Sequence, residues 1–116
     1  MSQSSIREMI REYENEILKG DLLPIRASEM LIEMSALLGN VLDKITETEM
    51  LYNQVLLKNY DSEKTANRAK IKSEITDEFK NMRDAKNTEK VLLEVIRGLK
   101  YFLRMKEDEY KAGRNL

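Results

Sequence analysis

The chain has 116 residues, enough for one domain, with 41% hydrophobic residues, 35% charged residues and a net charge of −1. The near-neutral charge argues against general attraction to nucleic acids or membranes. The lack of cysteine and histidine excludes disulfides and the commonest routes to zinc binding and nucleophilic catalysis, so we predict no cofactor.

Two sequence features are absent that would direct the protein into or across a membrane. No apolar run approaches the ~18 residues of a membrane span, and residues 1–5 lack the basic and apolar regions of a signal peptide. We therefore expect a cytoplasmic protein.

A short first helix is predicted over residues 5–19. Ser5 and Glu8 have the spacing of a capping box, and Gly20 stands where a left-handed residue would end the helix. Pro24 suits the first turn of a second helix, because its missing amide hydrogen would have no partner there.

The second helix is predicted over residues 23–59 and carries apolar residues at alternating steps of four and three. This a/d spacing is typical of a helix that presents a narrow seam to another helix. Gly39 interrupts it, and we interpret this glycine as a close approach of another backbone, with a kink as the alternative. The positions with this spacing are Ala27, Leu31, Met34, Leu38, Val41, Ile45, Thr48, Tyr52 and Val55, and Met30, Leu37, Leu42 and Leu56 widen the seam.

The third helix is predicted over residues 62–112, after a break at residues 60–62. The sequence allows two interpretations of residues 86–88. Asn87 and Thr88 either cap a separate helix or form a polar turn of a continuous one. No glycine or proline enforces a stop there, so we favour continuity. No strand or hairpin turn is expected.

These elements predict an all-α fold in a single domain, residues 1–116: a short N-terminal helix followed by a long, coiled-coil-like antiparallel helical hairpin. Such a hairpin leaves one side of each helix thinly covered, so we expect a homo-oligomer. Residues 1–60 carry a net charge of −4 and residues 61–116 of +3, which favours pairing between the halves. The residues predicted to form the oligomer seam are Leu31, Leu38, Val41, Ile45, Tyr52, Val55, Leu92, Ile96, Leu99 and Leu103.

Two local groups of basic residues are candidates for contacts with phosphate groups. Displacing the counterions of a nucleic acid requires such patches, although neighbouring acidic residues dilute both groups here. The candidate residues are Arg68, Lys70, Lys72, Arg97, Lys100 and Arg104.

Carboxylates at helical spacing are the remaining route to enzymatic chemistry. Glu29 and Glu33 lie four apart, and Glu74, Asp77 and Glu78 form a second group. All-helical nucleotide pyrophosphohydrolases hold magnesium with carboxylates. This chain lacks their paired Glu-Glu-x-x-Glu and Glu-x-x-Asp arrangement, so solvated helix faces explain these residues better.

Four segments together resemble a known group of proteins. They are residues 52–58, which are one residue shorter than the group's tyrosine-to-lysine spacing, a Lys/Ala run at 64–72, Glu-Phe-Lys-Asn-Met-Arg at 78–83 and Val-Ile-Arg-Gly-Leu-Lys at 95–100. In this layout, residues 29–110 resemble the small helical accessory proteins of tailed bacteriophages, encoded near recombination and replication functions. The resemblance implies a phage or prophage origin and no catalytic residues.

We therefore predict a non-enzymatic accessory or adaptor protein that acts through helix-mediated oligomerisation and binds a protein partner of unknown identity. The alternative is a nucleic-acid-binding accessory factor in recombination or replication. A magnesium-dependent nucleotide pyrophosphohydrolase is a remote third hypothesis.

Overall fold

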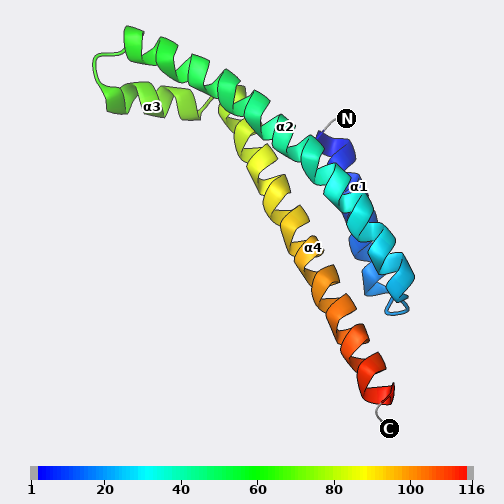
Figure 1. The fold of residues 1–116 in the computed structure, drawn as a ribbon. Helices are drawn as coiled ribbons and strands as arrows, with labels where there is room; N and C mark the ends of the chain where they lie inside the picture. The colour runs from blue at the N-terminus through cyan, green and yellow to red at the C-terminus, as the bar shows by residue number, and fades with distance from the viewer. Residues whose placement is uncertain (1–2, 115–116) are drawn as a thin grey trace.

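The computed structural model describes residues 3–114, which form four α-helices and, within that range, no strand. They are α1 (Gln3–Leu18), α2 (Pro24–Ser62), α3 (Ala66–Glu74) and α4 (Asp77–Arg114) (Figure 1). The molecule is elongated, with extents of 73 × 25 × 20 Å. The prediction of an all-α chain is confirmed. Residues 1–2 and 115–116 lie outside the described range.

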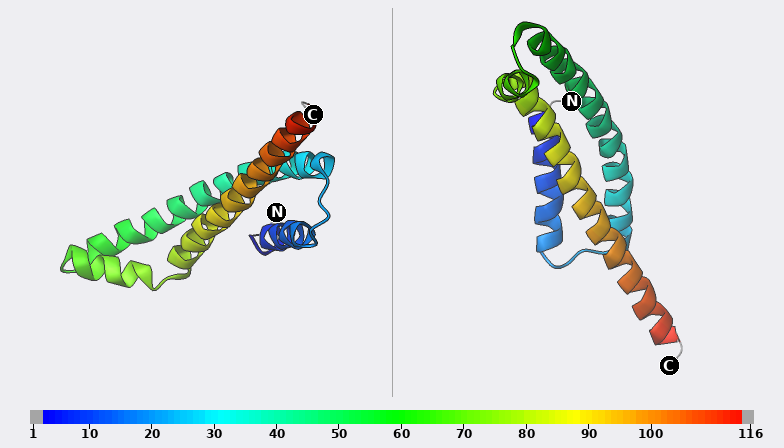
Figure 2. Two further views of the ribbon diagram at one scale, coloured as in Figure 1. Left: turned by 90° about the horizontal axis from the view of Figure 1, so that it is seen from below. Right: turned by 90° about the vertical axis from the view of Figure 1, so that its left-hand side faces the viewer.

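The rod is built on α2 and α4, which contact each other more extensively than any other two helices. After the short helix α3, the chain reverses, and α4 runs back along α2 in the opposite direction (Figure 1). The two views of Figure 2 place α1 on one side of the α2–α4 pair. The last turns of α4 project beyond the connection between α1 and α2, and residues 107–114 are exposed (Figure 1).

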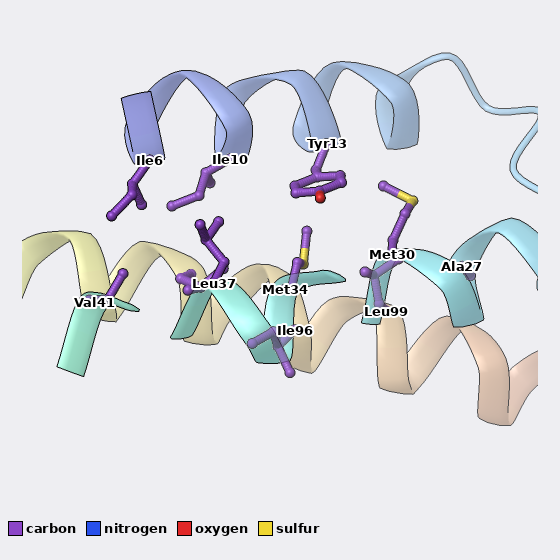
Figure 3. Packing of buried hydrophobic residues seen from close by; sticks show 11 residues of the cluster. Ile6, Ile10, Tyr13, Ala27, Met30, Met34, Leu37, Val41, Ile96 and Leu99 are labelled. Carbon is purple, nitrogen blue, oxygen red and sulfur yellow. The ribbon is translucent and has the colours of Figure 1, made fainter. Parts of the chain in front are cut away.

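The hydrophobic core lies where α1, α2 and α4 meet. Ile6, Ile10 and Tyr13 of α1 point toward α2 and α4 (Figure 3). Because α1 packs here, Met30 and Leu37 are buried, whereas the neighbouring seam positions Leu31 and Leu38 are half-buried. The buried cluster comprises Ile6, Ile10, Tyr13, Ala27, Met30, Met34, Leu37, Val41, Leu92, Ile96 and Leu99.

Polar contacts from two positions along α1 attach it to this one side. Arg7 Nε donates to Thr88 Oγ1 of α4 at 2.6 Å, and Arg7 also donates to the carbonyl of Asp84. The hydroxyl of Tyr13 donates to Glu33 at 2.8 Å. These bonds give the docking of α1 a defined position that apolar contacts alone would leave less specific.

The tip of the rod differs from the prediction, because residues 62–112 form two helices. The break falls at residues 75–76, where the Thr76 hydroxyl accepts from the amide of Phe79 and caps α4. Asp77 follows the cap and favours a helix start through its negative charge. A break at residues 86–88 is wrong: Thr88 is buried within α4, and its hydroxyl donates to the carbonyl four residues earlier.

The short helix α3 is held against α2 by a buried hydrogen bond. Asn59 Nδ2 donates to the Ser73 hydroxyl at 2.8 Å, and Ser73 donates in turn to the carbonyl of Ala69. The side chain of Thr65 caps α3. The predicted break at residues 60–62 is therefore a few residues early, since α2 continues to Ser62.

The remaining local predictions concern the two ends of α1, the start of α2 and Gly39. Gly20 has a φ of +80° after α1, and Pro24 is the first residue of α2, so both predictions are confirmed. The predicted capping box is wrong, because α1 begins at Gln3 and Ser5 lies inside it. The close approach at Gly39 is also wrong within the described chain, where no atom lies within 4 Å of an added Cβ.

We expect Leu92→Ala to lower the free energy of unfolding by about 2–5 kcal/mol, because the side chain is 0% exposed between three helices and its removal leaves a cavity. Urea denaturation at one protein concentration measures this loss. Leu18→Ala, at 81% exposure, is the control and should change stability by less than about 0.5 kcal/mol. Similar losses for both variants would contradict the described core.

Burial and the nearby carboxylate of Glu33 raise the pKa of Tyr13 from 10.0 to about 12. A raised pKa means that the folded chain holds the proton of Tyr13 more tightly than the unfolded chain does. The contribution of Tyr13 to stability is therefore complete below about pH 10 and is lost as the pH rises toward 12. We therefore expect Tyr13→Phe to show a shallower loss of stability between pH 10 and 12 than the parent chain, measured by urea denaturation. Tyr101→Phe, at an exposed position, should keep the parent slope.

Candidate interaction surface

No described helix covers the side of the α2–α4 pair that faces away from α1 (Figure 2). The side chains on that side are mostly apolar. On α2, Leu42 lies five residues after the α1-facing Leu37, hence about 140° around the helix. On α4, Leu93 lies five residues after Thr88, which bonds to α1. Leu42 is 45% exposed and Leu93 is 38% exposed. We name this surface the open face, comprising Leu31, Leu38, Leu42 and Ile45 of α2 and Leu93, Ile96 and Leu103 of α4.

The α2 part of the open face continues into a broad surface with almost no charge. Residues seven apart form a row along a helix, and three adjacent rows here start at Ile25, Ser28 and Leu31. Between residues 25 and 60, Glu49 is their one charged member, and it pairs with Lys86 at 3.1 Å. Exposed surface of this kind marks contact sites in other proteins. The large exposed apolar residues of these rows and their border are Ile25, Ile32, Leu42, Met50, Leu57 and Tyr60.

A basic row borders the α4 side of the open face. Its members follow one another at seven-residue spacing, and all are exposed. Arg97 lies nine residues after Thr88, half a turn away from the α1 side of α4. Two members have neutralising neighbours on α4, since Arg97 pairs with Glu94 and Lys111 with Glu107. The basic row comprises Arg83, Lys90, Arg97, Arg104 and Lys111.

The predicted seam residues divide into two groups by burial. Half of them are buried inside the single chain: Val41, Tyr52, Leu92, Ile96 and Leu99. The other half are partly exposed: Leu31, Leu38, Ile45, Val55 and Leu103. The first group therefore packs α2 against α4, and Tyr52 also contacts Phe79, with ring centroids 5.3 Å apart. A role in assembly of copies stays a prediction and concerns the second group.

The predicted phosphate contacts lie in two separate places. Arg68, Lys70 and Lys72 are exposed on α3 at the tip of the rod, whereas the other three lie on the second half of α4 (Figure 1). Lys72 pairs with Glu63 at 3.1 Å. Arg97 and Arg104 belong to the basic row, and Lys100 is an exposed residue beside it.

The carboxylates considered as metal ligands either pair with Arg26 or are not grouped closely enough to share an ion. Arg26 bridges Glu29 and Glu33 at 3.4 Å each and binds Glu16 at 2.6 Å, which lowers the pKa of Glu16. Within residues 3–114, no three Asp or Glu side chains are grouped so that they could hold a metal ion.

A second apolar feature is a cleft between the end of α1 and the middle of α4. It has a volume of about 510 Å³, and Ile17, Val95 and Phe102 are among its lining residues. Gly98 contributes to the opening, because no atom occupies the space next to its Cα. The cleft has one titratable lining residue, Glu14, and therefore offers shape without catalytic groups.

Searches of protein-family models, curated proteins and solved structures find no significant match to this chain. Every helix within residues 3–114 is too short or too polar to cross a lipid bilayer.

Sequence reasoning identified Arg97 and Arg104 but missed the extension of the basic row to Arg83 and Lys90, and it missed the side on which α1 docks. The seven-residue spacing of the basic row was visible in the sequence, but its meaning depends on which face of α4 is covered. Arg7 and Thr88 are 81 residues apart, so no local pattern indicates their bond.

Proposed function

We propose that this chain is a non-enzymatic accessory or adaptor protein of the cytoplasm that self-associates through its long helical hairpin and presents the assembled surface to a macromolecular partner. The observation that carries this proposal is the open face. Its residues are apolar and, apart from the buried Ile96, half-buried or exposed, and no described helix covers them.

The physical reason is the shape of the molecule. A helix pair gains stability by covering its apolar rows, and α1 covers one side only. An uncovered side with half-buried leucines would gain further burial from a helical partner. The resemblance to small phage accessory proteins supports a role of this kind and a phage or prophage origin.

A nucleic-acid-binding accessory factor is the second candidate, favoured by the basic row. Exposed arginines and lysines in line along α4 suit contacts with successive phosphate groups. This function leaves the uncharged surface of α2 without a role, which is why we place it second.

We expect sedimentation velocity at micromolar concentration to show a dimer or a larger assembly of the parent chain. Leu42→Glu combined with Leu93→Glu should shift it toward monomer, because both changes put charge on the open face. Leu18→Glu, at the far end of α1, is the matched control and should leave the assembly unchanged. A monomeric parent chain would overturn the proposal.

For the second candidate, fluorescence anisotropy with single-stranded and duplex DNA should show binding that weakens steeply between about 50 and 200 mM salt. Neutralising Arg97, Lys100 and Arg104 to Gln should reduce binding more than the same change of Arg68, Lys70 and Lys72. No binding at the lower salt concentration would dismiss this function.

A further inference from the structure

We propose that the open face is occupied by a second copy of this chain, related by a two-fold axis parallel to the rod, so that each α2 lies against α4 of the other copy. This arrangement deepens the self-association proposed above and rests on it. It defines an isologous four-helix contact in which the same surface is buried on both copies.

Charge decides which helices face each other. α2 has three basic and six acidic residues, whereas α4 has ten basic and eight acidic residues. A two-fold axis across the rod would put α4 on α4 and bring the two basic rows together. An axis along the rod instead brings each basic row to the partner copy's acidic α2.

Symmetry also sets the register. Rotation about an axis parallel to the rod leaves the height along the rod unchanged, so residues that are level within one chain are level between copies. The Glu49–Lys86 ion pair shows which residues of the antiparallel helices are level. Counting from it, Asp43 is level with Leu92, between Lys90 and Arg97 of the basic row.

The same count places Glu29, the other exposed acidic residue in the row of Asp43 on α2. Glu29 is level with Lys106 and adjacent in height to Arg104 of the basic row. Asp43 and Glu29 stand in one row, fourteen residues apart, just beyond the uncharged surface of α2. Each copy therefore offers two acidic positions where the other offers basic ones.

The surface is large enough for a stable dimer. Residues 28–56 of α2 span about 42 Å, and two packed helices are about 20 Å wide. The projected area is thus roughly 840 Å², close to the ~800 Å² that each partner contributes to a specific interface. Gly39, with open space beside it, lies within this surface and permits a close helix contact.

Disulfide cross-linking tests the arrangement, because the natural chain has no cysteine. Ser35 and Lys100 are level, and both lie in the rows that would face the partner copy. Glu49 and Lys86, which lie in these same rows, pair within one chain, but a disulfide inside one chain leaves a monomer on a non-reducing gel. A covalent dimer therefore reports only a contact between copies. We expect the Ser35→Cys/Lys100→Cys chain to form covalent dimers on a non-reducing gel after mild oxidation.

Matched controls separate the possible outcomes. Ser35→Cys/Tyr101→Cys moves one thiol to the next position around α4 and should cross-link far less. Each single cysteine chain should stay uncrosslinked, and efficient dimers from Ser35→Cys alone would overturn the arrangement in favour of α2 on α2. A monomeric parent chain defeats the proposed function, whereas an assembled parent without the expected cross-link defeats this inference only.

Charge reversal gives an independent readout in the same assembly. Lys90→Glu/Arg97→Glu should weaken self-association by at least about tenfold, measured by sedimentation, because each reversed contact occurs twice in a symmetric dimer. Adding Asp43→Lys to that chain should recover most of the loss. Arg68→Glu/Lys70→Glu, with the same change in net charge on α3, should have little effect. Equal weakening by both reversals, or no recovery, would overturn the proposed pairing.

Discussion

The packing of α2 against α4 is the interaction on which the rest of this structure depends. These helices have 39 and 38 residues, and each can cover only one face of the other. α1 has 16 residues, about 24 Å of helix, and covers a second face along part of that length. The apolar rows that remain on α2 have no counterpart within the described chain, and the proposed function follows from that imbalance.

Polar contacts determine which face remains. Arg7 bonds to Thr88 at one end of α1, and Arg26 binds Glu16 near the other end. Between them, Tyr13 donates to Glu33. Hydrogen bonds with defined geometry restrict α1 to one side of the pair, where apolar contact alone would tolerate several positions. The side without α1 is then apolar in its middle and basic along the α4 border.

The distribution of charge has two distinct consequences on this framework. Within the chain, exposed pairs such as Lys86 with Glu49 contribute little stability but define which residues of the antiparallel helices are level. Between copies, the basic row and the acidic border of α2 would select one pairing over another. Orientation, more than binding strength, is what surface charges supply in helical assemblies.

The sequence by itself determined the helical content, the approximate extent of α1 and α2, the left-handed Gly20 and the first-turn Pro24, because these depend on hydrogen bonds and backbone preferences within a turn or two. The seven-residue pattern also indicated that α2 packs lengthwise against another helix, without specifying which one. Only the tertiary structure decided that Met30 and Leu37 are buried ahead of Leu31 and Leu38, and that Thr76 starts a new helix while Thr88 continues one. Both outcomes depend on packing: α1 selects one flank of the seam and satisfies Thr88 from 81 residues away, which no local pattern records.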